Sequence, residues 1–272
     1  MKKSLYLLSI AFISLKAFGQ DGKHILILNK HQITFGSSKI EINNDGFPKY
    51  IFSSDQLLYE PIHFHYFTSS KTQEKLVSDS ILVNSSTGDH VGWSGISHSD
   101  NIKQGIEVMM SANGLIKFKV KLTALKNMKF SNIAFHIPFN KSTAKYLYGL
   151  SEKNYLRPDT VRWRWDSLPK IKPSVWIGNT NGGLYLSLNA KTYSSAPAIQ
   201  NGWAITNRGQ LQINIKGSSM LYEYSTGDLV LKEGDMLLFD FNLIINPAPS
   251  FEKLPDIASR FRNYQKLDFK NK

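Results

Sequence analysis

The chain of 272 residues contains no cysteine. Disulfide bonds and thiolate metal sites are therefore excluded, and the core has to be held together by packing alone. A chain of this length can bury enough apolar surface for that. Three functional motifs are missing as well. There is no cysteine nucleophile and no Gly-x-Ser-x-Gly elbow, and Gly178–Gly183 lacks the lysine and the following helix of a phosphate-binding loop.

Long apolar runs are also missing. The run Leu5–Ile13 follows two lysines but is too short to cross a bilayer, and Ala17–Gly19 has the small-x-small pattern of a cleavage site. We expect residues 1–19 to be a signal peptide that is removed before Gln20. The protein would then be exported, periplasmic or extracellular, with no membrane span after cleavage. A membrane anchor that is never cleaved is the alternative.

Basic clusters are lacking although the formal net charge is +12. Lysine and arginine are scattered along the chain, which is typical of a solvated basic surface. Together with the export signal, this pattern argues against a nucleic-acid partner and leaves acidic glycans as the other class that a basic surface attracts.

Helical periodicity is missing before residue 250, and short β-type runs separated by glycine-containing turns take its place. These features predict an all-β fold: a large sandwich of two antiparallel sheets. The expected strands are Ile25–Leu28, Gln32–Phe35, Lys39–Ile42, Phe64–Phe67, Ile81–Val83, Ile106–Met110, Leu115–Leu122, Asn132–Pro138, Ser174–Ile177, Leu184–Leu188, Gln210–Ile215, Met220–Tyr224 and Met236–Ile245.

Ala112–Gly114 is the clearest hairpin turn, and its Asn-Gly pair favours type I′. In the strand that follows, apolar residues alternate with Lys117, Lys119 and Lys121, which predicts one buried face and one solvated lysine face. A short helix is expected over Pro255–Lys266. We therefore divide the chain into a signal peptide (residues 1–19), a β-sandwich domain (20–250) and a C-terminal helix or tail (251–272).

The stretch Leu147–Leu188 is the most distinctive part of the chain. A strand over Val161–Asp166 would place Arg162, Arg164 and Asp166 on one face and Val161, Trp163 and Trp165 on the other. Arginine and tryptophan at this density are costly to place unless each guanidinium finds a carboxylate or an aromatic face. Gly178–Gly183 then predicts a tight turn into the strand Leu184–Leu188.

The pattern GL-x5-LRPD-x2-RWRWD…WIGN-x-N-x-GL resembles the domain that precedes the catalytic barrel in bacterial glycoside hydrolase family 123-type proteins. Two further blocks agree in the same order: Leu57–His65, and Lys232–Asp235 together with Phe239–Ile245. The resemblance covers roughly Ile33 to Tyr264 and implies a supersandwich-like N-terminal domain. In that family a barrel of about 250 residues would follow. Because the family's catalytic carboxylates lie on the barrel, the resemblance offers no catalytic residue for this chain.

The residues themselves offer one catalytic alternative and one metal-binding alternative. Glu152, Asp159 or Asp166 could serve a glycan-active enzyme, but arginine neighbours would depress the carboxyl pKa values and oppose general-acid catalysis. His63 and His65 on one strand face could bind zinc if a third ligand joined them. Glu60 is near in sequence, and a structural role for the histidine pair is favoured. We therefore expect no catalytic residue, metal or cofactor.

Carbohydrate binding remains. Sugar sites combine aromatic platforms with planar polar side chains, and the stretch around RWRWD supplies both. The predicted substrate-binding residues are Arg157, Arg162, Trp163, Arg164, Trp165, Asp166, Trp176 and Asn179. Further aromatic platforms are offered by Trp93, Trp203, Tyr185 and Tyr193. The opposing interpretation is structural, with core tryptophans and an arginine–carboxylate network.

The sequence thus predicts an exported, non-catalytic, carbohydrate-associated β-sandwich module of a glycoside hydrolase system, either stand-alone or truncated. An independent glycan-active enzyme is one alternative. The other is a docking module for a separate catalytic barrel chain.

Overall fold

A computed structural model describes residues 26–150, 156–164, 174–189, 199–204 and 208–247. Within these ranges three β-sheets form the fold, and the helical content is one 3₁₀ turn at Gly202–Ala204. No helix in the described ranges is long and apolar enough to span a membrane. The predicted all-β class is confirmed. The predicted signal peptide and the helix Pro255–Lys266 lie outside the described residues.

The five-stranded sheet is a meander of the first five strands in chain order. Its strands are β1 (Ile27–Asn29), β2 (Gln32–Phe35), β3 (Ser38–Ile42), β4 (Pro48–Ser53) and β5 (Asp55–Gln56).

The seven-stranded sheet has the order β15-β19-β20-β13-β6-β7, and β21 pairs with β13. Its strands are β6 (His63–Thr68), β7 (Gln73–Glu74), β13 (Met128–Asn140), β15 (Thr160–Arg164), β19 (Gln210–Lys216), β20 (Ser219–Ser225) and β21 (Leu229–Leu231).

The ten-stranded sheet has the order β14-β16-β17-β22-β12-β11-β10-β8, with β9 on β10 and β18 on β22. All described pairs in it are antiparallel except β18 with β22. Its strands are β8 (Val77–Ser78), β9 (Leu82–Ser86), β10 (His90–His98), β11 (Ile102–Ser111), β12 (Leu115–Ala124), β14 (Tyr146–Gly149), β16 (Ser174–Gly178), β17 (Gly182–Leu188), β18 (Ile199–Asn201) and β22 (Met236–Pro247).

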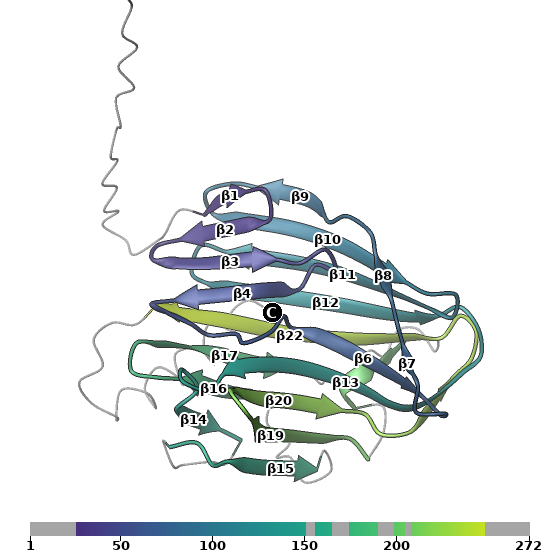
Figure 1. Cartoon of the computed structure of the whole chain (residues 1–272). Coiled ribbons are helices and arrows are strands. Elements are labelled where there is room, and N and C mark those ends of the chain that lie inside the picture. Colours follow the sequence, from purple (N-terminus) through teal and green to yellow (C-terminus); the bar gives the residue numbers. More distant parts are fainter. Residues whose placement is uncertain (1–25, 151–155, 165–173, 190–198, 205–207, 248–272) are drawn as a thin grey trace, which may run out of the picture.

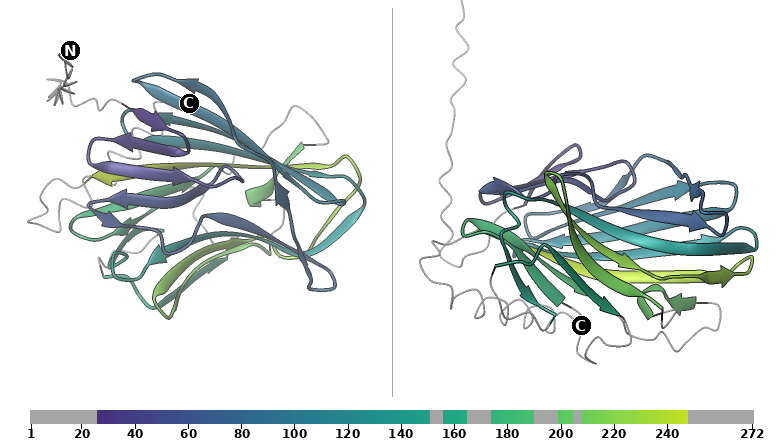
Figure 2. Two further views of the ribbon diagram at one scale, coloured as in Figure 1. Left: turned by 45° about the horizontal axis from the view of Figure 1, so that its top comes forward. Right: turned by 60° about the horizontal axis from the view of Figure 1, so that its bottom comes forward.

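The five- and seven-stranded sheets lie over the same face of the ten-stranded sheet, as Figure 1 and the turned views of Figure 2 show. Aromatic pairs connect the layers. Phe47, which precedes β4, stacks on Phe118 of β12 with ring centroids 6.3 Å apart. The ring centroids of Phe64 in β6 and Phe239 in β22 lie 5.0 Å apart. One continuous apolar core therefore fills the space between the layers.

The two central strands of the ten-stranded sheet show how alternation builds this core. Phe118 and Phe241 are paired in register and stack with ring centroids 4.5 Å apart on the buried face. On the opposite face Lys119 is paired with Asp240 and Glu107 on its two neighbouring strands. Lys119 is exposed, as the sequence predicts for the lysine face of β12.

The hairpin between β11 and β12 is confirmed, but the predicted type I′ turn is wrong. That turn needs a positive φ at two residues, and here only Gly114 has one, at 82°. The amide of Gly114 donates to the carbonyl of Ser111 over 3.0 Å, and the side chain of Asn113 accepts from the Leu115 amide. The loop is therefore a three-residue turn that ends in a left-handed glycine.

Strand β10 was not expected, because Gly92 and Gly95 interrupt its apolar pattern. A Cβ atom on Gly95 would lie 3.2 Å from the carbonyl oxygen of Asp45, so the glycine lets the turn before β4 approach the sheet closely. In the same region the indole of Trp93 donates to the carbonyl of Gly46 over 2.8 Å. The lack of a side chain at Gly95 therefore allows the two layers to pack closely here.

Candidate functional site

Strand β15 carries the first part of the RWRWD motif and lies at one end of the seven-stranded sheet. Val161 and Trp163 are half-buried and paired with the buried residues Ile213 and Leu211 of β19. Arg162 and Arg164 are exposed. The predicted alternation is confirmed for these four residues. The remaining predicted residues of the motif, Trp165 and Asp166, lie outside the described residues, as does Glu152.

Arg157 is held by the backbone. Its side chain is only 11% exposed. Its Nε donates to the carbonyl of Ala144, and its backbone amide donates to the carbonyl of Lys145 over 3.1 Å. One guanidinium nitrogen also lies 3.6 Å from the carboxylate of Asp159, which is 92% exposed. This placement favours the structural role that the sequence left open for Arg157.

Trp176 and Asn179 belong to the hairpin of β16 and β17. Trp176 is buried in a small cluster with Leu115, Tyr185 and Ile244. The Asn179 side chain accepts from the amides of Asn181 and Gly182 and donates to Asp55 over 2.9 Å. These contacts close the predicted turn and tie it to the five-stranded sheet. The structural interpretation is again favoured.

The other tryptophans proposed as platforms are core residues: Trp93 and Trp203 are fully buried, as is Tyr185. Tyr193 lies outside the described residues. Trp203 packs against rings of both layers, including Phe135 and Phe239. Its indole donates to the carbonyl of Asp240 over 2.6 Å. None of these three buried rings offers a surface to a sugar.

A polar row crosses the seven-stranded sheet on the face that points away from the core. Its residues are directly paired from one strand to the next, over five strands, in the order Arg162, Gln212, Glu223, His136 and His63. Their neighbours along the strands, such as Phe64, Phe135 and Tyr222, are buried in the core. Because side chains alternate along strands, the row shares one outward face.

The row is connected by short contacts. Gln212 donates to one carboxylate oxygen of Glu223 over 2.6 Å, and the other oxygen lies 2.8 Å from Nε2 of His136. Nδ1 of His136 lies 3.2 Å from Nε2 of His63. His65, two residues further along β6, joins them, so that one ring nitrogen from each histidine lies within 4.8 Å of the others.

Burial and these neighbours shift the pKa values. Burial raises the pKa of Glu223, but the hydrogen bond and charge of His136, together with the Gln212 hydrogen bond, outweigh it and lower the value. Burial also lowers the pKa of His63. For His65, burial and the two neighbouring histidines lower the pKa to about 4. The face therefore presents a carboxylate at Glu223 and neutral imidazoles at His63 and His65 near neutral pH.

A cavity of about 450 Å³ opens over this cluster. The three histidines line it together with Pro138 and Leu221, and Tyr59, Glu60 and residues 216–219 complete the lining. Tyr59 is 49% exposed. The cavity thus combines an accessible aromatic ring with imidazole, carboxylate and ammonium groups.

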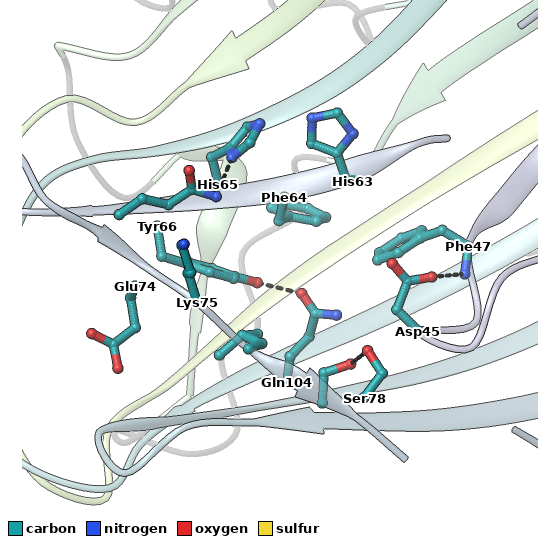
Figure 3. A pocket seen from close by; sticks show the side chains of 13 residues that line it. Asp45, Phe47, His63, Phe64, His65, Tyr66, Glu74, Lys75, Ser78 and Gln104 are labelled. Atoms are coloured by element: carbon teal, nitrogen blue, oxygen red, sulfur yellow. Dashed lines mark hydrogen bonds between the residues drawn. The ribbon is translucent and has the colours of Figure 1, made fainter. Parts of the chain in front are cut away.

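A second cavity, of about 430 Å³, lies mainly on the other side of β6. Figure 3 shows His63 and His65 on one side of the strand, and Phe64 and Tyr66 on the side that faces Gln104 and Asp45. Tyr66 donates to Gln104 over 2.5 Å. Burial raises the pKa of Asp45, although hydrogen bonds from the Phe47 amide and Asn43 oppose it.

The alternation of the sequence places His63 and His65 on one strand face, but no local pattern connects His136 with them, because His136 lies 73 residues from His63 in the sequence. The only available signal is that the segments of β6 and β13 both alternate and could therefore pair as strands. Tyr59 was not proposed as a platform either. It precedes a strand, where no periodic pattern indicates exposure.

Comparison with known proteins identifies the family. The model of the glycoside hydrolase 123 third domain matches residues 26–247. No curated protein matches the chain. Among solved structures, the chain is similar to the galactose mutarotase related enzyme of Lactobacillus acidophilus at 10% identity and a TM-score of 0.46, covering 85% of this chain and 100% of that one.

Galactose 1-epimerase of the same organism is similar at 9% identity and a TM-score of 0.47, with 83% of this chain and 98% of that one covered. The expected resemblance to a non-barrel domain of family 123 is confirmed. The family description numbers this domain third, so a position directly before the barrel stays a prediction. The chain belongs to the family of the glycoside hydrolase 123 third domain.

Proposed function

We propose that this domain is an exported, non-catalytic carbohydrate-binding module of a glycoside hydrolase system, and that it holds a sugar in the cavity over the histidine cluster. The observation that carries the proposal is the exposed ring of Tyr59 beside a cavity with His63, His136 and Lys216 in its lining. An aromatic ring can stack on the C–H face of a sugar, and the polar groups can pair with its hydroxyls. The cavity volume is in the range of small-ligand sites.

Glu223, beside the cavity, and Asp159, beside the RWRWD motif, support a binding role over hydrolysis. Glu223 accepts hydrogen bonds from His136 and Gln212, and its pKa is lowered, which is unfavourable for a general acid. Asp159 is almost fully exposed next to Arg157. Neither has the buried, proton-retaining environment that glycoside hydrolysis requires of its acid.

Isothermal titration calorimetry with N-acetylgalactosamine and N-acetylglucosamine oligosaccharides tests the proposal. We expect weak binding that Tyr59→Ala weakens about tenfold or more, as the loss of an interface aromatic does. Tyr50→Ala is the matched control, because Tyr50 is a half-buried tyrosine that stacks on Phe52 in the five-stranded sheet. Binding that is insensitive to Tyr59→Ala would overturn the proposed site.

The non-catalytic part of the proposal has its own assay. The chain should release no aryl group from aryl N-acetylgalactosaminides or N-acetylglucosaminides above background. Turnover that Glu223→Gln or Asp159→Asn abolishes would instead establish an enzyme.

Export is tested by intact-mass measurement of the protein from the periplasm or the medium. A mass that corresponds to a chain starting at Gln20 is expected. Full-length chain found in the cytoplasm alone would contradict export.

A further inference from the structure

We propose that His63, His65 and His136 bind one divalent transition-metal ion of the zinc type, with the fourth coordination position open to the cavity. This inference concerns the same face as the proposed sugar site but does not rest on sugar binding. It rests on the positions of the ring nitrogens, which lie within 4.8 Å of one another on two adjacent strands.

The hydrogen-bond partners determine which nitrogens carry hydrogen. The carbonyl of Pro61 lies 2.8 Å from Nδ1 of His63 and can only accept, so this nitrogen carries the hydrogen. The carboxylate of Glu223 accepts in the same way from Nε2 of His136. In neutral rings, Nε2 of His63 and Nδ1 of His136 are therefore both lone-pair acceptors.

These two acceptors lie 3.2 Å apart. In neutral rings two lone pairs at this distance repel each other. A cation that both can bind relieves the repulsion, either as a proton shared between the rings or as a metal ion that makes both nitrogens ligands. Tetrahedral zinc with Zn–N bonds of about 2.0–2.1 Å separates its nitrogen ligands by about 3.3–3.4 Å. The separation of the two ring nitrogens is thus close to that required for coordination.

The surroundings of His63 and His136 match those of metal-binding histidines. Such histidines usually donate their second ring N–H to a carboxylate, a backbone carbonyl or a water molecule, which fixes the ring. Glu223 and Pro61 supply two of these partners. The side-chain amide nitrogen of Gln73 donates to Nδ1 of His65 over 2.7 Å. Coordination through Nε2 of His65 therefore requires the Gln73 amide to turn its oxygen toward Nδ1, so that Nδ1 carries the hydrogen. Gln212 in turn holds Glu223.

The donor set indicates the class of metal. Three imidazoles suit zinc, cobalt, nickel and copper, whereas magnesium and calcium prefer oxygen ligands. Three protein ligands with an open fourth position are the arrangement of accessible zinc sites. Here the open position would face the cavity that Tyr59 and Glu60 border, where a water molecule or a hydroxyl group of a ligand could bind.

The test uses the full chain, treated with a chelator, dialysed, and titrated in sugar-free buffer with Zn²⁺ in a calorimeter and with Co²⁺ in a visible spectrometer. We expect one equivalent of Zn²⁺ to bind, and Co²⁺ to develop the visible absorption of a tetrahedral site. His136→Ala should weaken Zn²⁺ binding at least about 100-fold. Glu223→Gln should weaken it about 10- to 100-fold, because Glu223 only orients a ligand.

His98→Ala is the matched control, because His98 is an exposed strand histidine on β10, outside the cluster. It should leave Zn²⁺ affinity unchanged. His65→Ala provides a second ligand variant in case His136→Ala does not fold, which near-UV circular dichroism would reveal.

Absence of stoichiometric Zn²⁺ binding to the wild-type chain would overturn the proposal. The contact between His63 and His136 would then be a hydrogen bond through a shared proton. Binding that the ligand variants and His98→Ala weaken equally would overturn the proposal too. Because no sugar is present, either result leaves the carbohydrate proposal to be decided by its own titration.

Discussion

At the scale of single residues, Asp240 illustrates how burial and neighbouring charges oppose each other. It lies in β22, paired with Lys119 of β12, and beyond Lys119 lies Glu107 of β11. Burial raises the pKa of Asp240 to about 6, the charge of Lys119 lowers it, and Glu107 raises it further. The lysine on the adjacent strand therefore does not fully offset the loss of solvation.

This pKa predicts a pH dependence of stability. In the folded chain Asp240 keeps its proton up to about pH 6, whereas in the unfolded chain it loses the proton near its ordinary value of 3.8. The folded state binds more protons between these values, so the contribution of Asp240 to stability falls as the pH rises from about 4 to 6. Asp240→Asn should remove this loss.

Urea unfolding at pH 4 and pH 7.5 measures the effect. The free energy of unfolding of Asp240→Asn, relative to wild type, should rise by about 1 kcal/mol between the two pH values, after allowance for partial exposure. A relative free energy that is the same at both pH values would contradict the assignment.

At the scale of elements, the hairpin of β16 and β17 explains the glycines of the WIGN motif. Gly178 and Gly183 are directly paired, and the indole of Trp176 lies against both. A Cβ atom on Gly183 would lie 2.6 Å from the carbonyl oxygen of Ile177 and 2.6 Å from the Trp176 ring. The motif is therefore a packing unit in which two residues without side chains make room for a large one.

Gly183→Ala should destabilise the chain by about 1–3 kcal/mol or more, because neither the backbone oxygen nor the buried ring can easily move away. Gly105→Ala is the matched control in the same sheet, because a Cβ atom there has no neighbour within 4 Å. The control should change stability by no more than about 1 kcal/mol. Chemical denaturation of both variants provides the comparison, and equal losses would refute the packing explanation.

At the scale of the whole molecule, one apolar cluster includes residues of all three sheets. Ile40 of the five-stranded sheet, Phe135 of the seven-stranded sheet and Phe241 of the ten-stranded sheet all belong to it. Asp55 adds a polar connection, because it accepts from both Asn179 and Asn181 of the β16–β17 turn. We therefore expect the three sheets to unfold together.

Ile40→Ala tests this cooperativity, because Ile40 is fully buried at one side of the common core. It should lower the free energy of unfolding by about 2–5 kcal/mol and shift the whole transition. Far-UV circular dichroism and near-UV circular dichroism, which reports on the buried tryptophans, should shift by the same amount. Val230→Ala, at a residue that is 65% exposed, should leave the transition nearly unchanged. Two separate transitions would show that the five-stranded sheet unfolds independently.

Much of this architecture could be predicted from the sequence, because alternation and turn chemistry are local properties. The apolar and lysine residues of β12 specify its two faces, and Val161 and Trp163 share a face with each other and not with Arg162. The family too was recognisable from local motifs such as RWRWD and WIGN. Strand β10 escaped prediction because its glycines serve contacts with the distant turn at Asp45.

The sequence by itself determined the all-β class, most strands and the family. The tertiary structure decided which long-range pairs form. Arg157, Trp176 and Asn179 have the composition of a binding site, but backbone contacts and burial make them part of the framework. His136 acquires its significance only when β13 pairs with β6, and strand register between segments some 70 residues apart is not encoded by any local pattern. The candidate site exists because that register aligns histidines and a glutamate across one sheet face.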